Sequence, residues 1–347
     1  MNLEAAVSPP VEWLLASDEP WTRYGTLVDL MGLSESDHQV IQARQEMIRH
    51  PLVQSLLSAV AAWPGPPIRR HNDSAHPIHQ LAILADMGFR YDDSGLDRVV
   101  REVTARSSPD GLPLSLLNIP TLFGGTGTDS LSWMLCDATT LLSSLARLSK
   151  ERASLDCQDS GLLKAAAYLA SLADDNGWRC KVAPDLGKFH GPGKRSDPCP
   201  IANLLALKAL APFSELRNSE AARAGAQVLL THWDASERAR RRLNAAPGEA
   251  EPPLERPYLF GCGSEFRKLR YPMVWYDCLH ALHALRPYPF VQQDSRFQSL
   301  KAHVRSLSDA GGRFTASAMY RPWQGWSFAD KKRPSPWLTL VVWRELQ

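Results

Sequence analysis

The stretch KRSDPCPIANLLALKALA, residues 194–211, joins a helix-start signal to a long apolar run. Its apolar residues recur at the spacing of an α-helix. Asp197 followed by Pro198 is typical of a helix start, because a carboxylate accepts hydrogen bonds from free backbone N–H groups and proline suits the first helical position. Capping does not explain Cys199. A thiol in the first turn lies at the positive end of the helix dipole, which favours the thiolate.

The same helical spacing recurs along the whole chain, and no segment has a convincing strand pattern. The other periodic segments are HQVIQARQEMI, IHQLAILADMG, LDRVVREV, LSWMLCDATTLLSSLARL, LLKAAAYLASLA, AARAGAQVLLTHW, YDCLHALHALRPY, FQSLKAHVRSL and WLTLVVWREL. This pattern predicts an all-α protein of roughly a dozen helices, joined by turns rich in proline and glycine. We expect the helices to alternate between an inner and an outer layer around a central cavity, because near-continuous apolar segments such as LLKAAAYLASLA need partners on more than one side.

Three turns resemble one another. SSPDGLP, ADDNGWR and SDAGGRF each follow a predicted helix, and their glycines are Gly111, Gly177 and Gly312. The first two glycines are 66 residues apart and the last two 135, close to twice as far. This spacing indicates a repeat of helix pairs, as in a solenoid or a closed toroid. An ordinary glycine at a helix C-terminus is the alternative explanation.

Length and composition favour one large domain over residues 1–347, although the length also allows two domains. Hydrophobic residues make up 44% of the chain and charged residues 22%, which are ordinary values for a globular protein. One segment differs: SERARRRLNAAPGEAEPPLERP, residues 236–257, runs from basic to acidic with four prolines. We interpret it as a mobile loop, with a domain boundary as the alternative.

Charge and hydropathy bear on partners and location. The formal net charge of +2 offers no electrostatic basis for binding nucleic acid or a membrane surface. The N-terminal stretch lacks a secretion signal, and no apolar run is long enough for an integral membrane segment, so we expect a cytoplasmic protein. The six irregularly spaced cysteines are interpreted as thiols rather than a disulfide framework.

Two motifs carry a resemblance to a known family. KRSDPCPIANLL and VWYDCLHALHAL resemble the zinc-binding segments of the β subunits of protein farnesyl- and geranylgeranyltransferases, within the terpene-cyclase and prenyltransferase superfamily. The glycine turns resemble the weak repeats of that superfamily, and the C-terminal segment is similar to a group of bacterial toroid proteins. The resemblance implies an α/α toroid and catalytic zinc held by Asp197, Cys199 and His280.

The resemblance also implies roles beyond the metal ligands. Lys194 matches a family lysine that helps to hold the prenyl diphosphate. Asp277 precedes His280 by one helical turn, and we expect it to orient a ligand. The chain departs from the family at Gly191, where the family has an arginine, and at Pro200, where it has a tyrosine. Zinc is therefore better supported than prenyl diphosphate.

Ordinary structural explanations compete with each candidate. Capping, burial of a small thiol and burial of a core histidine could explain the three zinc candidates one by one. A second histidine group, in RHNDSAHPIHQ, could bind metal, but capping and cavity lining explain it better. DKKRPSP precedes a helix start that could hold an anion, or is simply a solvated surface. The residues of these two groups are His71, Asp73, His76, His79, Lys331, Lys332 and Arg333.

The sequence therefore predicts a zinc-dependent, prenyltransferase-like enzyme that activates a thiol or water in an apolar cavity. Its substrate would be a small or isoprenoid-like molecule, and no partner subunit can be named. One alternative is a non-catalytic toroid that binds an isoprenoid or a partner helix. Another is a cyclase that uses a different acid, because the chain lacks the Asp-x-Asp-Asp motif of squalene-hopene cyclases.

Overall fold

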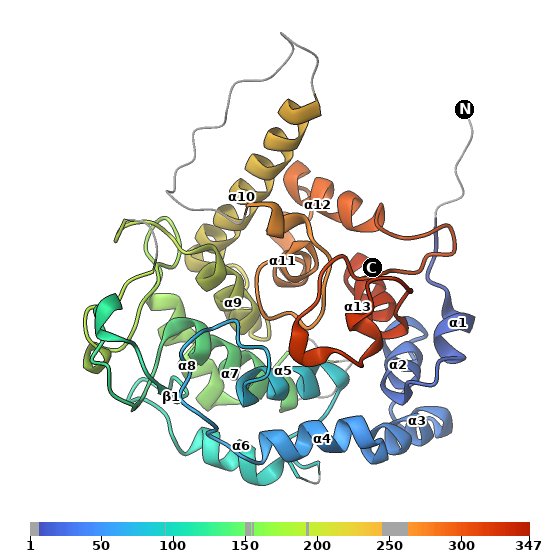
Figure 1. Ribbon diagram of the computed structural model, residues 1–347, viewed down its shortest axis with the longest axis horizontal. Coiled ribbons are helices and arrows are strands. Elements are labelled where there is room, and N and C mark those ends of the chain that lie inside the picture. The colour runs from blue at the N-terminus through green and yellow to red at the C-terminus, as the bar shows by residue number, and fades with distance from the viewer. Residues whose placement is uncertain (1–6, 94, 150–153, 155, 192–193, 245–262) are drawn as a thin grey trace.

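The computed structural model describes residues 7–93, 95–149, 154, 156–191, 194–244 and 263–347, and most of their regular secondary structure is helical (Figure 1). The α-helices are α1 (Val11–Leu15), α2 (Pro20–Gly25), α3 (His38–Arg49), α4 (Pro51–Val60), α5 (Pro77–Met87), α6 (Asp97–Thr104), α7 (Leu135–Leu148), α8 (Ser160–Ser171), α9 (Pro200–Leu210), α10 (Glu220–Asn244), α11 (Cys278–Leu285), α12 (Ser295–Arg305) and α13 (Pro336–Leu346). The predicted all-α class is confirmed.

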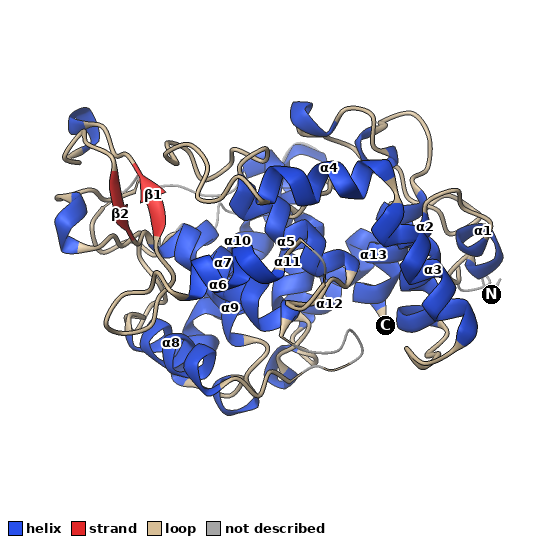
Figure 2. Cartoon of the chain, turned by 90° about the horizontal axis from the view of Figure 1, so that it is seen from below, coloured by secondary structure: helices blue, strands red, loops and turns tan. Residues whose placement is uncertain are grey.

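One small sheet departs from the sequence prediction. Strands β1 (Ser115–Leu117) and β2 (Ser130–Ser132) pair antiparallel and lie at one end of the molecule, far from α1–α3 (Figure 2). The segment LSWMLCDATTLLSSLARL was expected to be helical throughout, but its first residues belong to β2 and α7 begins at Leu135. Among the described residues, no helix is both long and apolar enough to cross a membrane.

Every second helix from α5 to α13 belongs to one packed series. Helices α5, α7, α9, α11 and α13 contact one another in that order, while α4, α8, α10 and α12 pack against their outer sides. Burial follows this division: every residue of α9 except Lys208 is buried, whereas α6 buries only Val99 and Val103. Helices that bury all faces must have neighbours on all sides, so the series forms the inner layer of the protein.

Helix α8 belongs to the outer layer and contacts α7, α9 and α10. Its buried residues are Ala165, Ala166 and Leu169, while Lys164 and Ala167 are exposed. Alanine favours a helix and leaves little apolar surface in water when it is exposed. The alanine-rich sequence therefore looked more deeply buried than it is.

The three similar turns share one backbone geometry. The N–H groups of Gly111, Gly177 and Gly312 each donate to the carbonyl group three residues earlier. All three glycines have left-handed φ angles, of +92°, +95° and +74°, which favour glycine because it has no Cβ. The turns follow α6, α8 and α12 and return the chain to the inner layer. The structure thus bears out a repeated helix–turn unit.

Two further findings concern the ends of the described segments. Residues 236–244 of the predicted loop continue α10, and the rest of that loop lies outside the described residues. Helix α13 packs beside α1 and α2, so the two ends of the described chain meet (Figure 1). An ion pair between Asp86 of α5 and Arg344 of α13 also joins the first and last inner helices.

Candidate functional site

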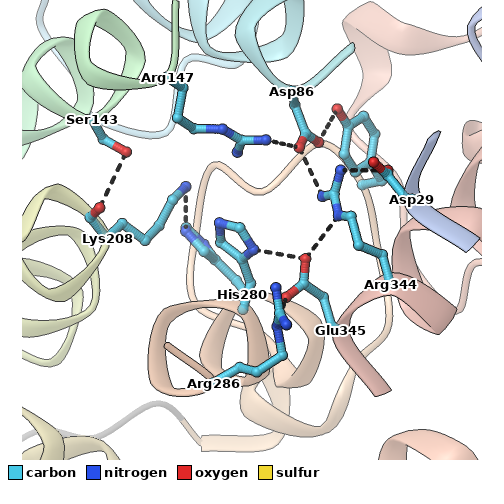
Figure 3. Close-up of polar contacts among 11 residues, drawn as sticks. Asp29, Asp86, Ser143, Arg147, Lys208, His280, Arg286, Arg344 and Glu345 are labelled. Atoms are coloured by element: carbon cyan, nitrogen blue, oxygen red, sulfur yellow. Dashed lines mark hydrogen bonds and ion pairs between the residues drawn. The ribbon is translucent and has the colours of Figure 1, made fainter. Parts of the chain in front are cut away.

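The last turns of the inner helices bring charged side chains together (Figure 3). Four basic residues lie in the last turns of α7, α9, α11 and α13, namely Arg147, Lys208, His283 and Arg344 in that order. Basic residues are stabilised there because the C-terminus of a helix carries partial negative charge. The inner layer therefore contains a polar centre, although the helices around it are apolar.

Asp86 is the acidic hub of this centre. Its Oδ1 atom accepts hydrogen bonds from Arg147 at 2.7 Å and Arg344 at 2.8 Å, and its Oδ2 atom accepts one from the Tyr271 hydroxyl at 2.8 Å. Burial alone would raise the pKa of Asp86, but the two guanidinium groups outweigh it and hold the pKa well below its usual value. Asp86 is therefore a permanent carboxylate that fixes three side chains.

Glu345 forms a second hub. Its carboxylate is 2.9 Å from His283 Nδ1 and accepts hydrogen bonds from Arg286 and Arg344, each at 3.0 Å. Against the effect of burial, these neighbours hold the pKa of Glu345 well below its usual value. The Arg344 guanidinium contacts both hubs, and Asp29 lies 3.7 Å from it.

Lys208 has a different kind of partner. Its Nζ atom lies 3.1 Å from His280 Nε2, and His280 Nδ1 lies 2.7 Å from the carbonyl oxygen of Trp275. Because a carbonyl oxygen can only accept, Nδ1 carries the proton and Nε2 accepts from the Lys208 ammonium. Burial and then the charge of Lys208 hold the pKa of His280 well below its usual value, so His280 is neutral.

The described part of the chain gives the Lys208 ammonium no ion-pair partner, although the charges of Asp86, Glu345 and Asp277 favour it from farther away. Its hydrogen bond runs to a neutral imidazole. Burial, and after it the charge of Arg147, lowers the pKa of Lys208 from 10.5 to about 8. Lys208 is thus a half-buried amine that changes charge near pH 8.

Lys208, Arg147 and Ser143 line two adjoining cavities. One has a volume of about 30 Å³, with room for about two water molecules. The other has a volume of about 400 Å³, within the range of small-molecule sites, and is more open. Arg147, Lys208, Arg286 and Arg344 line the larger cavity, together with the carboxylates of Asp29 and Glu345. Cations therefore outnumber carboxylates on its wall.

The predicted zinc ligands occupy separate environments. Asp197 accepts a hydrogen bond from the Lys194 backbone N–H at 2.8 Å, and the Lys194 side chain is exposed. The N-cap of α9 is Cys199, not Asp197, so the helix begins at Pro200, two residues later than expected. Both ring nitrogens of His280 are engaged at the polar centre. Asp197, Cys199 and His280 are not brought together, and no group of three or more metal-binding side chains is found among the described residues.

Asp277 positions its helix rather than the imidazole ring. Its carboxylate accepts a hydrogen bond from the backbone N–H of His280 at 2.9 Å, so it caps α11. Its other oxygen lies 3.2 Å from Arg270 Nε. Burial raises the pKa of Asp277 to about 7, although Arg270 opposes that effect. Asp277 therefore contacts His280 through its backbone N–H, whereas the carbonyl oxygen of Trp275 fixes the orientation of the imidazole ring.

In the second histidine group, His76 caps a helix, and His79 and His71 line small cavities. His76 caps α5, because its Nδ1 atom accepts from the Ile78 N–H at 3.3 Å, and its Nε2 atom lies 2.9 Å from the carbonyl oxygen of Pro66. His79 Nε2 lies 2.7 Å from the His71 carbonyl oxygen. All three side chains of the basic group, Lys331, Lys332 and Arg333, are exposed on the surface.

Sequence reasoning missed the polar centre, although a signal was present. Lys208 and Asp86 each interrupt an otherwise apolar helical segment near its end. A buried charge without a partner costs free energy. A single charge in a predominantly apolar helical segment therefore indicates that the residue has a buried partner or a function. Comparisons with family models and with curated proteins found no match to this chain.

Proposed function

We propose that this chain is an α/α-toroid protein that binds a small organic anion in its 400 Å³ central cavity and acts on it through Lys208. One observation carries the proposal: a half-buried ammonium group lines a ligand-sized cavity and has no ion-pair carboxylate among the described residues. A carboxylate or phosphate group bound there would supply the missing negative charge. The alternating helical layers and the Asp86–Arg344 link support the toroid architecture.

The chemistry follows from the Lys208–His280 pair. An amine with a pKa of about 8 can give up or take a proton near neutral pH, which suits general acid–base catalysis. The Nε2 atom of neutral His280 holds the ammonium in place. The surrounding arginines are held by Asp86 and Glu345, so they can bind an anion without rearranging. Lys208 is therefore the proposed catalytic residue, and His280 is its positioning residue.

The alternatives from the sequence gain less support. A cyclase acid must be protonated and face the cavity. The pKa values of Asp86 and Glu345 are both held low, and Asp277, whose pKa is raised, caps α11 and bonds to Arg270 rather than lining the larger cavity. An isoprenoid chain needs apolar walls, whereas charged side chains line the larger cavity. Zinc remains a prediction from the family resemblance. Zinc bound at His280 Nε2 would have to displace the Lys208 ammonium.

Isothermal titration calorimetry tests the proposal by measuring anion binding, with inorganic phosphate, diphosphate and citrate as probes. We expect at least one probe to bind to the wild type and to bind at least tenfold more weakly to Lys208→Met. Lys164→Met, an exposed lysine change on α8, should bind as the wild type does. Equal binding by all three proteins, or no binding of any probe to the wild type, would contradict the proposal.

A second readout separates binding at Lys208 from binding elsewhere on the surface. An anion beside the ammonium raises the pKa of Lys208, so binding near pH 8 should take up about half a proton per chain, and binding near pH 6.5 almost none. Titrations in buffers of different ionisation enthalpy measure this uptake. Uptake that is the same in Lys208→Met would place the anion somewhere else.

A further inference from the structure

An open groove of about 650 Å³ lies between two segments that are far apart in the sequence. Residues of the segment 66–74, which leads into α5, line one wall, and residues 320–322 line the other. Three exposed arginines belong to these walls: Arg69 and Arg70 come from the first segment and Arg321 from the second. We call this site the arginine groove.

The three arginines have no partner among the residues that the structure describes. None of them takes part in an ion pair, a side-chain hydrogen bond or a ring contact there. By contrast, the exposed Arg101 of α6 pairs with Asp97 at 3.0 Å. Asp73 also lines the groove, and its Oδ1 atom accepts a hydrogen bond from the Ala75 N–H at 3.2 Å. Three arginines and one aspartate give the described wall a formal charge of +2, which attracts an anionic partner.

Hydrogen bonds hold both walls of the arginine groove in place. The indole N–H of buried Trp323 donates to the carbonyl oxygen of Ser74 at 3.1 Å and so joins the two segments directly. The backbone N–H of Trp323 also donates to the carbonyl oxygen of Tyr320 at 3.0 Å. In the first segment, the Ile68 N–H donates to the carbonyl oxygen of Leu116 in β1 at 2.8 Å. A partner would therefore meet a main chain that is already fixed, so little ordering of the backbone opposes binding.

The arginines of the groove are suited to carboxylates. Arginine and tyrosine are enriched where proteins meet, and Tyr320 lines the same groove. A guanidinium group can donate two parallel hydrogen bonds to one carboxylate. Arg69 and Arg70 are adjacent in the chain and Arg321 belongs to the other wall, so they can bind separate carboxylates of one extended segment.

The polar residues of the groove favour a peptide over a phosphate ligand. Asn72 and Asp73 are both exposed on its wall. The Asn72 amide can donate and accept hydrogen bonds, whereas the Asp73 carboxylate can only accept. A peptide backbone uses both kinds of group, because it has N–H donors and C=O acceptors. A phosphate group has only acceptors when it is fully ionised, and the charge of Asp73 repels it.

We propose that the arginine groove binds an acidic segment of a partner protein, whose aspartate or glutamate carboxylates pair with Arg69, Arg70 and Arg321. The inference does not depend on the function proposed for the central cavity, because the two sites have no lining residue in common. The charges that carry it are exposed, so the interaction weakens as the salt concentration rises.

Fluorescence anisotropy with a labelled hexaglutamate peptide tests the proposal. We expect the wild type to bind hexaglutamate at least tenfold more tightly than a labelled peptide of six glutamines. Arg70→Gln and Arg321→Gln should each weaken binding at least threefold, and the double variant at least tenfold. Arg101→Gln, which changes an exposed arginine outside the groove, should bind as the wild type does. Circular dichroism establishes that the variants are folded.

Other results would overturn the proposal. If hexaglutamate does not bind to the wild type, or binds equally well to the folded double variant, the arginine groove is not a site for acidic peptides. If Lys208→Met weakens binding and Arg321→Gln does not, the peptide binds at the central cavity. A single-stranded DNA of six nucleotides should bind at least tenfold more weakly than hexaglutamate. If it binds as tightly, the groove recognises phosphate groups and not a peptide.

Discussion

Replacing Lys208 by methionine should make the ligand-free protein more stable, because the wild type keeps a charge where burial opposes it. Lowering the pKa of Lys208 from 10.5 to about 8 corresponds to about 3 kcal/mol of destabilisation when the lysine is charged in both states. Methionine has a similar shape and carries no charge. It leaves His280 Nε2 without its donor, which costs about 1 kcal/mol. The net gain at pH 7 is about 2 kcal/mol.

The gain should depend on pH in a defined way. Below about pH 8, Lys208 is protonated in the folded and the unfolded chain, so the full penalty applies. Between about pH 8 and 10.5, the folded protein loses this proton first, and the unfolded chain binds more protons. Wild-type stability then rises with pH relative to Lys208→Met. Above pH 10.5 the advantage of the variant disappears.

The assay is thermal and urea unfolding of both proteins at several pH values between 6 and 10. At pH 7 a gain of about 2 kcal/mol should raise the melting temperature of a chain of this length by about 3 °C. Lys164→Met is the control, because this exposed side chain should change stability by less than about 0.5 kcal/mol. A Lys208→Met protein no more stable than the wild type at pH 7, with a parallel pH profile, would refute the reasoning.

Three further predictions concern the hub, the turn and the metal. Asp86→Asn should lower the free energy of unfolding by about 3 kcal/mol at pH 7, because it leaves buried guanidinium groups unpaired. The loss should shrink as acid protonates the wild-type carboxylate. Urea unfolding measures the effect, and the exposed Asp97→Asn is the control. Asn203→Ala should cost about 2–3 kcal/mol, since it removes three buried hydrogen bonds, whereas Asn176→Ala, which removes one exposed bond, should cost less than about 0.5 kcal/mol. The family resemblance predicts about one zinc per chain by elemental analysis of protein purified without chelator or a His tag, and protein without any transition metal would contradict it.

The sequence predicted the helical layers better than the site because the two depend on different information. Periodicity is local, so the helix after Cys199 and the turns at Gly177 and Gly312 could be recognised from a few residues each. The site depends on which distant side chains meet. Asp86 and Arg344 belong to the first and last inner helices, and no short motif contains both.

The zinc prediction illustrates the limit of spacing arguments. Asp197, Cys199 and His280 occur in the order and context of the family motif, but order in the chain does not determine where a ring nitrogen points. His280 Nε2 accepts from Lys208, which the motif does not include. For Cys199, the prediction of a favoured thiolate agrees with its lowered pKa, yet the main cause is Cys180, which sequence reasoning did not connect with it.

The bond between Arg344 and Asp86 joins residues 258 positions apart, and this has a consequence during protein synthesis. A ribosome adds the residues between them in a time on the order of tens of seconds. Throughout that interval Asp86 has been made but one of its two arginines has not, so the inner layer of the nascent chain is incomplete. Contacts between such distant positions also make folding slow. The apolar surfaces of the early helices are therefore exposed for much of translation, and this is the period in which a chaperone would protect the chain.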